Sequence, residues 1–129
     1  MTTYLLDANV LIALTIAEHE HHDRATRWAA QVDRLALSPI VEGALVRFLV
    51  RIGESIGAAT ELLHEIKHHP RCDFWPDSLS YAAADLAHVR GHRQLTDAYL
   101  ASLAEANGGL LATFDAALAH AIPDTVVLV

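Results

Sequence analysis

The chain of 129 residues has one cysteine, one lysine and no apolar run of the length that a membrane span requires. A single cysteine, Cys72, excludes an internal disulfide framework and fits a reducing compartment. A membrane-spanning helix needs about 18 or more apolar residues in succession, and no basic residue precedes the first apolar run as it does in a secretory signal. We therefore expect a soluble, cytoplasmic protein with no membrane contact.

Positive charge is also scarce. Nine lysines and arginines stand against sixteen aspartates and glutamates, which gives a net charge of -7 with histidine neutral. This balance disfavours general electrostatic attraction to nucleic acid. It is compatible with a cluster of carboxylates that holds cations, and with a basic partner protein.

Short apolar segments alternate with helical patterns along the chain, which is typical of a parallel sheet covered on both faces. Ser38-Pro39 is a good helix start, with serine as the cap, and Asn107-Gly108-Gly109 is a good helix end. The pattern predicts one α/β three-layer sandwich over residues 1–129. Strands are expected at 4–6, 35–37, 72–75, 110–113 and 125–129, and helices at 9–15, 24–32, 39–52, 55–67, 80–89 and 96–106.

Three aspartates stand where a parallel sheet places its ligands, beyond the carboxyl ends of the strands. Asp7 directly follows the first strand, and Asp115 follows the strand at 110–113 with one residue between. Asp97 lies in the first turn of the helix before that strand. Each also has a structural explanation, because Asp7 and Asp115 can cap helices and Asp97 suits a helix dipole. Together they favour a site for a hard cation, magnesium or manganese.

Glu42 is a fourth candidate, in the first turns after the strand at 35–37. With Ser38 as the cap it stands at the fourth helical position, beyond the reach of a capping box. An ionised carboxylate on an apolar flank is costly unless it is paired or bound to metal. Its neighbours three, four and seven positions on are all apolar, namely Leu45, Val46 and Leu49.

The lone lysine excludes two other classes of acidic magnesium site. Receiver domains and aspartyl-nucleophile phosphatases place a lysine on the phosphoryl group. Here Lys67 falls at the end of a mid-chain helix rather than after a strand. The phosphatase pattern also wants an aspartate two residues after the first, and position 9 is asparagine.

Three segments, LLDANVLIAL, SPIVEGALVR and LTDAYLASLAEANGGLLATFDAAL, together resemble the PIN-domain toxins of VapC type. The resemblance implies a single PIN domain over 1–129 with a parallel five-stranded sheet between helices. It also implies that Asp7, Glu42, Asp97 and Asp115 bind Mg²⁺ or Mn²⁺ to cleave RNA. Asn9 and Thr113 match further polar positions of the family, although the segment reads DAN where many members have DTN.

The function implied by this resemblance is that of an endoribonuclease toxin, which cleaves RNA by metal-activated water and is neutralised by a cognate antitoxin. Four arginines are candidates for steering RNA, and a homodimer within a hetero-oligomer is expected. The alternative is a PIN-fold binding module that acts mainly in a co-repressing complex with a DNA-binding antitoxin. A DNA nuclease similar to flap endonucleases fits less well, since that class carries more acids on a larger chain. The arginines that are candidates for steering RNA are Arg47, Arg51, Arg90 and Arg93.

Two further clusters have open interpretations. His19, His21 and His22 form either a transition-metal site or a solvated loop and helix start. A set of apolar residues near the acids forms either a groove for an amphipathic segment of the antitoxin or part of the core. The set comprises Val10, Leu11, Ile12, Leu14, Leu45, Phe48 and Leu49.

Overall fold

The computed structural model describes residues 1–129 and contains a five-stranded, fully parallel sheet with strand order β3-β2-β1-β4-β5. The predicted α/β class with helices around a parallel sheet is confirmed. The strands are β1 Thr3–Leu6, β2 Arg34–Leu37, β3 Cys72–Phe74, β4 Leu110–Thr113 and β5 Val126–Leu128. The helices are α1 Ala8–Thr15, α2 His22–Ala29, α3 Pro39–Arg51, α4 Ile56–Lys67, α5 Leu95–Ala106 and α6 Ala116–Ala121.

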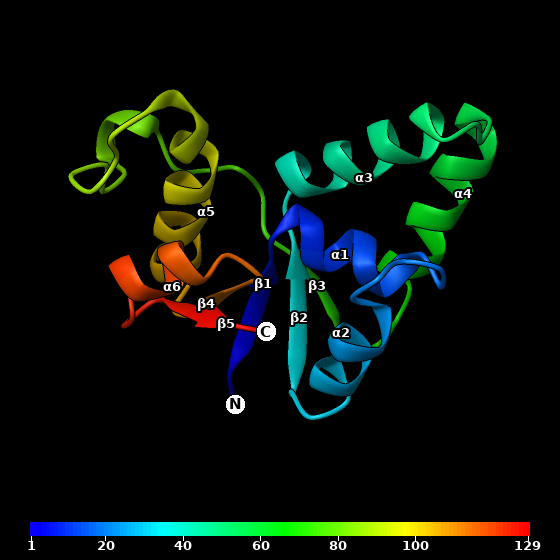
Figure 1. Cartoon of the computed structure of the whole chain (residues 1–129), viewed down its shortest axis with the longest axis horizontal. Coiled ribbons are helices and arrows are strands. Elements are labelled where there is room, and N and C mark those ends of the chain that lie inside the picture. Colours follow the sequence, from blue (N-terminus) through cyan, green and yellow to red (C-terminus); the bar gives the residue numbers. More distant parts are fainter.

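The strand order reverses direction at β1. From β1 the chain adds β2 and then β3 on one side, and later adds β4 and β5 on the other. Because parallel crossovers are right-handed, this reversal sends α1 to α4 to one face of the sheet and α5 and α6 to the other (Figure 1). The carboxyl ends of β1 and β4 thus flank the switch point, where open α/β sheets bind their ligands.

The core lies between the sheet and both helical layers. Leu5 and Leu6 of β1 and Leu111 of β4 are buried, as are Tyr99 and Leu103 of α5. Most of the apolar set near the acids also belongs here, so of its two interpretations the core is the one that the structure favours for these residues. Only Leu14 and Phe48 of that set are half-buried, while Val10, Leu11, Ile12, Leu45 and Leu49 are each at most 8% exposed.

Two local predictions are wrong. The helix expected at 80–89 is absent, and the segment contains only a 3₁₀ turn at Tyr81–Ala83. Most of its residues are exposed, so the segment lacks the packed apolar face that stabilises a short helix. Ser38 does precede α3, with Pro39 at the first helical position, but its buried hydroxyl makes no capping bond.

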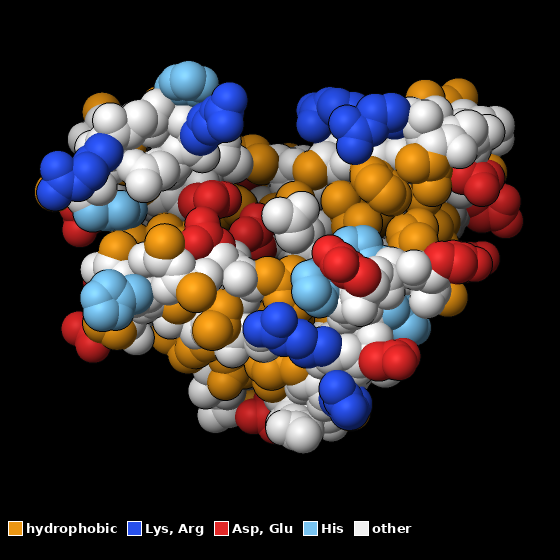
Figure 2. Space-filling model, viewed as in Figure 1, with side chains coloured by type: hydrophobic (Ala, Val, Ile, Leu, Met, Phe, Trp, Pro, Cys, Tyr) orange, Lys and Arg blue, Asp and Glu red, His pale blue; other side chains and the backbone are white.

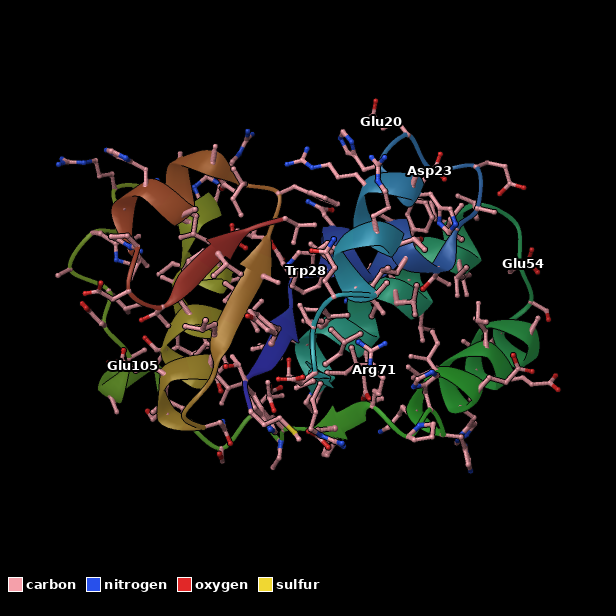
Figure 3. The ribbon with its side chains drawn as sticks, turned by 90° about the horizontal axis from the view of Figure 1, so that it is seen from below. Glu20, Asp23, Trp28, Glu54, Arg71 and Glu105 are labelled. Atoms are coloured by element: carbon pink, nitrogen blue, oxygen red, sulfur yellow. The ribbon has the colours of Figure 1, made fainter.

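Polar and aromatic contacts outside the sheet fix the end of α2. The guanidinium of Arg71 donates to the carbonyl oxygens of Ala29, Val32 and Asp33, at and after the end of α2. Trp28 packs edge-on against Tyr4 with ring centroids 5.3 Å apart, and Figure 3 labels both Trp28 and Arg71 in this region.

None of the helices combines the length and apolar character needed to cross a bilayer.

Gly109 should be the least replaceable glycine. A Cβ at this position would lie 2.5 Å from the Thr3 carbonyl oxygen and 2.6 Å from the Trp75 ring, and backbone cannot move aside cheaply. We expect Gly109→Ala to destabilise the fold by about 1–3 kcal/mol or more in urea unfolding. The control is Gly57→Ala in α4, where the nearest atom is 3.9 Å away and alanine should stabilise the helix by about 0.5–1 kcal/mol. Equal stabilities of the two variants would contradict this packing.

Candidate active site

Asp7, Asp97 and Asp115 come together at the carboxyl ends of the two central strands. Asp7 directly follows β1, and its backbone N–H donates to the Ala112 carbonyl oxygen in β4 at 3.0 Å. Asp115 lies two residues beyond the end of β4 and begins α6. Asp97 projects from the first turn of α5, and the charges of Asp7 and Asp115 both raise its pKa. The structure therefore brings three of the four predicted acids into one electrostatic cluster.

Asp7 is the fixed member of the cluster. Its side chain is buried, with one oxygen accepting from the Ala8 N–H at 2.7 Å and the other from the Thr113 hydroxyl at 2.8 Å. Thr113 Oγ1 in turn accepts from the Asp115 N–H at 3.0 Å. Burial raises the pKa of Asp7 more than these hydrogen bonds lower it. Asp7 thus caps α1 and also presents a carboxylate at the site, so the two interpretations are compatible.

Asp97 differs because no hydrogen bond in the structure compensates for its partial burial. Burial and, after it, the negative charges of Asp7 and Asp115 raise the pKa of Asp97 to about 6. A cation next to these carboxylates would remove that penalty, because an opposite charge favours the ionised form. The electrostatics of the cluster therefore favour a positively charged ligand.

Two cavities open onto the cluster, and Figure 2 shows the region as a notch with acidic side chains at its floor and basic side chains on both sides. A pocket of about 480 Å³ lies between α1, α3 and α5 and includes Asp7, Asn9, Arg47 and Asp97. A smaller one of about 70 Å³ is shared by Asp97, Asp115 and His88. A substrate in the larger pocket would thus contact the acids from the side of α3.

The acids fit a hard divalent cation by chemistry, although their side chains are not yet gathered around one point. As they stand, no three His, Cys, Asp or Glu side chains form a group that could hold a metal ion. The donors in the cluster are all carboxylate oxygens, the type that Mg²⁺ and Mn²⁺ prefer. These carboxylates repel one another when ionised, and a cation between them would offset that repulsion.

Glu42 does not join the other three acids. Its Oε2 lies 2.9 Å from Nζ of Lys67, and its side chain is only 13% exposed. Glu42 lines neither cavity at the cluster. The partner that its apolar surroundings demand is thus Lys67, a residue 25 positions away at the end of α4 that no local sequence pattern connects to it.

The remaining candidates separate in the same way. Of the four arginines, Arg47 lines the larger pocket, Arg51 lies over the Phe48 ring at 5.7 Å, and Arg90 and Arg93 are exposed in the segment before α5. The histidine cluster forms no common metal site. Its members make separate contacts: His22 Nδ1 bonds the Ala13 carbonyl oxygen, His19 Nδ1 accepts from the His21 N–H, and the His21 ring packs against Phe114.

The sequence prediction missed His88. Its Nε2 is buried without a hydrogen-bond partner in the small cavity beside Asp97 and Asp115. The predicted helix at 80–89 gave no reason to place this side chain near the acids. No signal in the sequence alone would have found it, because its position depends on the irregular path of that segment.

Known proteins resemble this chain along nearly its whole length. The family model described as the PIN domain matches residues 4–122. Ribonuclease VapC29 of Mycobacterium tuberculosis is 52% identical over 128 residues, covering 98% of this chain and 96% of the relative. Ribonuclease VapC39 of the same species is 39% identical, covering 91% of each chain.

Solved structures with the same fold are more distant in sequence. Mycobacterium tuberculosis VapC20, described as a sarcin-ricin loop cleaving toxin, matches with a TM-score of 0.70 at 19% identity, covering 92% of this chain and 94% of that one. VapBC2 from Rickettsia felis, bound to a DNA fragment from their promoter, matches with a TM-score of 0.66 at 18% identity. That match covers 99% of this chain and 98% of the other. These likenesses support the fold alone.

The raised pKa of Asp97 predicts how stability depends on pH without metal. Its folded-state value of about 6 exceeds the ordinary 3.8, so this group's contribution to stability is fully present below pH 3.8 and lost as pH rises through 6. Asp97→Asn removes that loss. At about 1.4 kcal/mol per tenfold change in proton affinity, discounted for partial exposure, the variant should gain on the order of 1–2 kcal/mol at pH 7.

The measurement is urea unfolding in EDTA from pH 4 to pH 7. The control is Glu105→Gln, an exposed acid near the other end of α5, labelled in Figure 3. Its stability should follow that of the unmodified protein. If the curves of Asp97→Asn and the unmodified protein run parallel, Asp97 is not electrostatically strained.

Proposed function

This chain belongs to the PIN-domain family, as a toxin of VapC type, and we propose that it is a Mg²⁺- or Mn²⁺-dependent endoribonuclease. The observation that carries the proposal is the cluster of Asp7, Asp97 and Asp115 at the switch point of the sheet. Each of these acids lines the larger pocket, the small cavity or both. The names of the relatives, which are ribonucleases, supply the substrate class.

Each acid has a distinct part in this proposal. Asp7 is held rigidly by Thr113 and the Ala8 N–H, so it fixes the position of the ion. Asp97, whose carboxylate makes no hydrogen bond in the structure, is free to turn toward the ion, and Asp115 supplies charge from the other strand. Glu42, the fourth predicted ligand, lies next to Lys67 outside the pocket in this structure, so it would have to turn away from Lys67 to join the other three acids.

A bound divalent ion would supply Lewis-acid chemistry, by activating water and offsetting charge on the scissile phosphate. The protein's own contribution is to hold the ion and to orient the RNA backbone across the notch. The net charge of -7 opposes RNA at long range, so the basic side chains on both sides of the notch must act locally.

The first test is loss of cleavage without loss of the fold. Asp97→Asn and Asp7→Asn should each reduce cleavage of single-stranded RNA in Mn²⁺ by at least about 100-fold, because each removes a charge that holds the ion. EDTA should abolish cleavage by the unmodified protein, and Mg²⁺ or Mn²⁺ should restore it. The matched control, Glu105→Gln, removes a carboxylate from the same helix and should cleave normally. Normal cleavage by a folded Asp97→Asn variant would refute the assignment.

A further part of the proposal is an antitoxin partner, within a complex in which the toxin also dimerises. One similar solved structure is described as a toxin–antitoxin complex from Klebsiella pneumoniae, and another as VapBC2 bound to a DNA fragment from their promoter. The apolar surface available for an amphipathic segment is a pocket of about 420 Å³ between α1, β2 and α4. It is lined by Leu11 and Leu14 of the predicted apolar set together with Leu62 and Ile66 of α4, but by no residue of α3.

Co-expression with the adjacent open reading frame tests the partner. We expect a stable complex on pull-down, restored growth and suppressed RNase activity. Leu62→Ser should weaken the complex more than Leu63→Ser, because both side chains are half-buried on α4 and only Leu62 lines the pocket. Absence of a complex, or a complex with full cleavage, would refute the partner. A complex that forms around a protein unable to cleave RNA would favour the co-repressing binding module instead.

A further inference from the structure

We infer that Phe114, Arg24 and His21 form a stacking platform for an RNA base beside the acidic cluster. The inference rests on the proposed function and adds to it a subsite that holds a nucleotide near the scissile phosphate by its base. Three features of the structure lead to it: the place of Phe114 in the chain, the side chains that lie against its ring, and the charges around them.

Phe114 lies between two residues of the acidic site. Thr113 precedes it and donates to Asp7, and Asp115 directly follows it. The Phe114 ring points instead to the start of α2, where it meets the ring of His21. Because Phe114 is bonded to Asp115, its ring lies within reach of a nucleotide whose phosphate is at the acids.

Two side chains from the start of α2 lie against the Phe114 ring. The guanidinium carbon of Arg24 lies over the ring, 5.2 Å from its centre. The centre of the His21 ring is 5.0 Å away at a tilt of 43°. His19 continues the row, with its ring centre 5.7 Å from that of His21. Proteins use flat aromatic and guanidinium groups of this kind to stack unpaired RNA bases.

The platform is held in place before a ligand arrives. Arg24 donates to the backbone oxygen of Val129, which keeps its guanidinium over the Phe114 ring. The Nδ1 atom of His22 lies 2.7 Å from the Ala13 carbonyl oxygen and fixes the start of α2 on α1. Arg24 is also exposed, so the guanidinium face turned away from Phe114 is open to a base. A group that is already ordered loses little conformational entropy on binding.

The charges around the platform favour a base over a phosphate as its ligand. Glu20 Oε1 lies 3.4 Å from Nε2 of His21, and Asp23 stands next to Arg24 in the first turn of α2. These carboxylates would repel a second phosphate, whereas a base is neutral. Figure 2 shows basic, histidine, acidic and apolar side chains together on the face below the notch, and Figure 3 labels Glu20 and Asp23 beside the start of α2.

A stacked base supplies a short-range contact that the overall charge does not oppose. The net charge of -7 repels the RNA backbone at long range, so binding depends on local contacts. Stacking tolerates every base because each has a flat face. A paired base has both faces covered by its neighbours in the helix, so the platform selects RNA that is single-stranded at this nucleotide.

The first arm of the experiment removes the bases of a fluorescent single-stranded RNA one at a time. Binding is measured in EDTA with the Asp97→Asn variant, so that nothing is cleaved. Loss of the base that stacks should weaken binding by at least about fivefold. When Phe114→Leu is added, which keeps the apolar bulk but not the flat ring, loss of that base should change affinity by less than about twofold. Unchanged sensitivity to the missing base would overturn the inference.

The second arm changes only the exposed arginine, so that the fold is not at stake. Arg24→Lys keeps the charge and loses the planar group, and should raise KM for RNA cleavage by at least about fivefold with kcat within about twofold. The matched control is Arg27→Lys, an exposed arginine of the same helix that lies over no aromatic ring. It should behave as the unmodified protein, and equal effects of the two lysine variants would contradict the platform.

Light scattering decides whether the platform instead joins two copies of the chain. The mass of the particle should be the same for the unmodified protein, Phe114→Leu and Arg24→Lys, and a lower mass in either variant would overturn the inference. If the unmodified protein cleaves no RNA, the proposed function fails. The comparison of RNAs with missing bases still tests the platform in that case, because it needs no cleavage.

Discussion

The hydrogen bond from Thr113 to Asp7 is the contact on which the site depends. It joins the end of β4 to the residue after β1, and it holds a buried carboxylate that has only one other hydrogen bond, from the Ala8 N–H. Parallel pairing of β1 with β4 puts these two residues side by side, and the Thr113 hydroxyl then orders the Asp115 backbone as well. A single threonine therefore fixes the relative positions of two acids from different strands. Burial, and after it the charge of neighbouring acids, raises the pKa of Asp7 and Asp97, although the Thr113 hydrogen bond itself lowers that of Asp7.

Much of this arrangement could be predicted from short-range patterns. Asp7 and Asp115 stand immediately beyond apolar strands, so a parallel sheet places both at one edge without further information. The end of α5 could also be predicted, from Asn107-Gly108-Gly109. In the structure Gly108 adopts φ +73°, as a helix-terminating glycine does. The class of the sheet followed from the alternation of strands and helices, although the strand order needed long-range pairing that no local pattern contains.

The features that the sequence could not predict share a physical cause, which is that they depend on contacts between residues distant in the chain. Glu42 was correctly expected to need a partner, but a metal ion and a lysine ammonium group can each fill that role. Only the path of α4 brings Lys67 next to it. The segment at 80–89 has four alanines and one leucine, which suit a helix, yet most of its residues are exposed and it stays irregular. That irregular path in turn carries His88 to the acids. The apolar residues of α1 and α3 were ambiguous for the same reason, because a core and a groove have the same composition.

The distance along the chain between the two halves of the site has a consequence for synthesis. Asp7 and Thr113 are 106 residues apart, and β1 has only β2 as a neighbour until Leu110–Thr113 has been made. Chains emerge from the ribosome N-terminal end first and close non-local contacts slowly. A nascent chain therefore presents Asp7 at an open sheet edge for most of its translation, without the partners that turn it into an acidic cluster. An enzyme that degrades RNA is in this way kept incomplete while it is still attached to the machinery, itself largely RNA, that makes it.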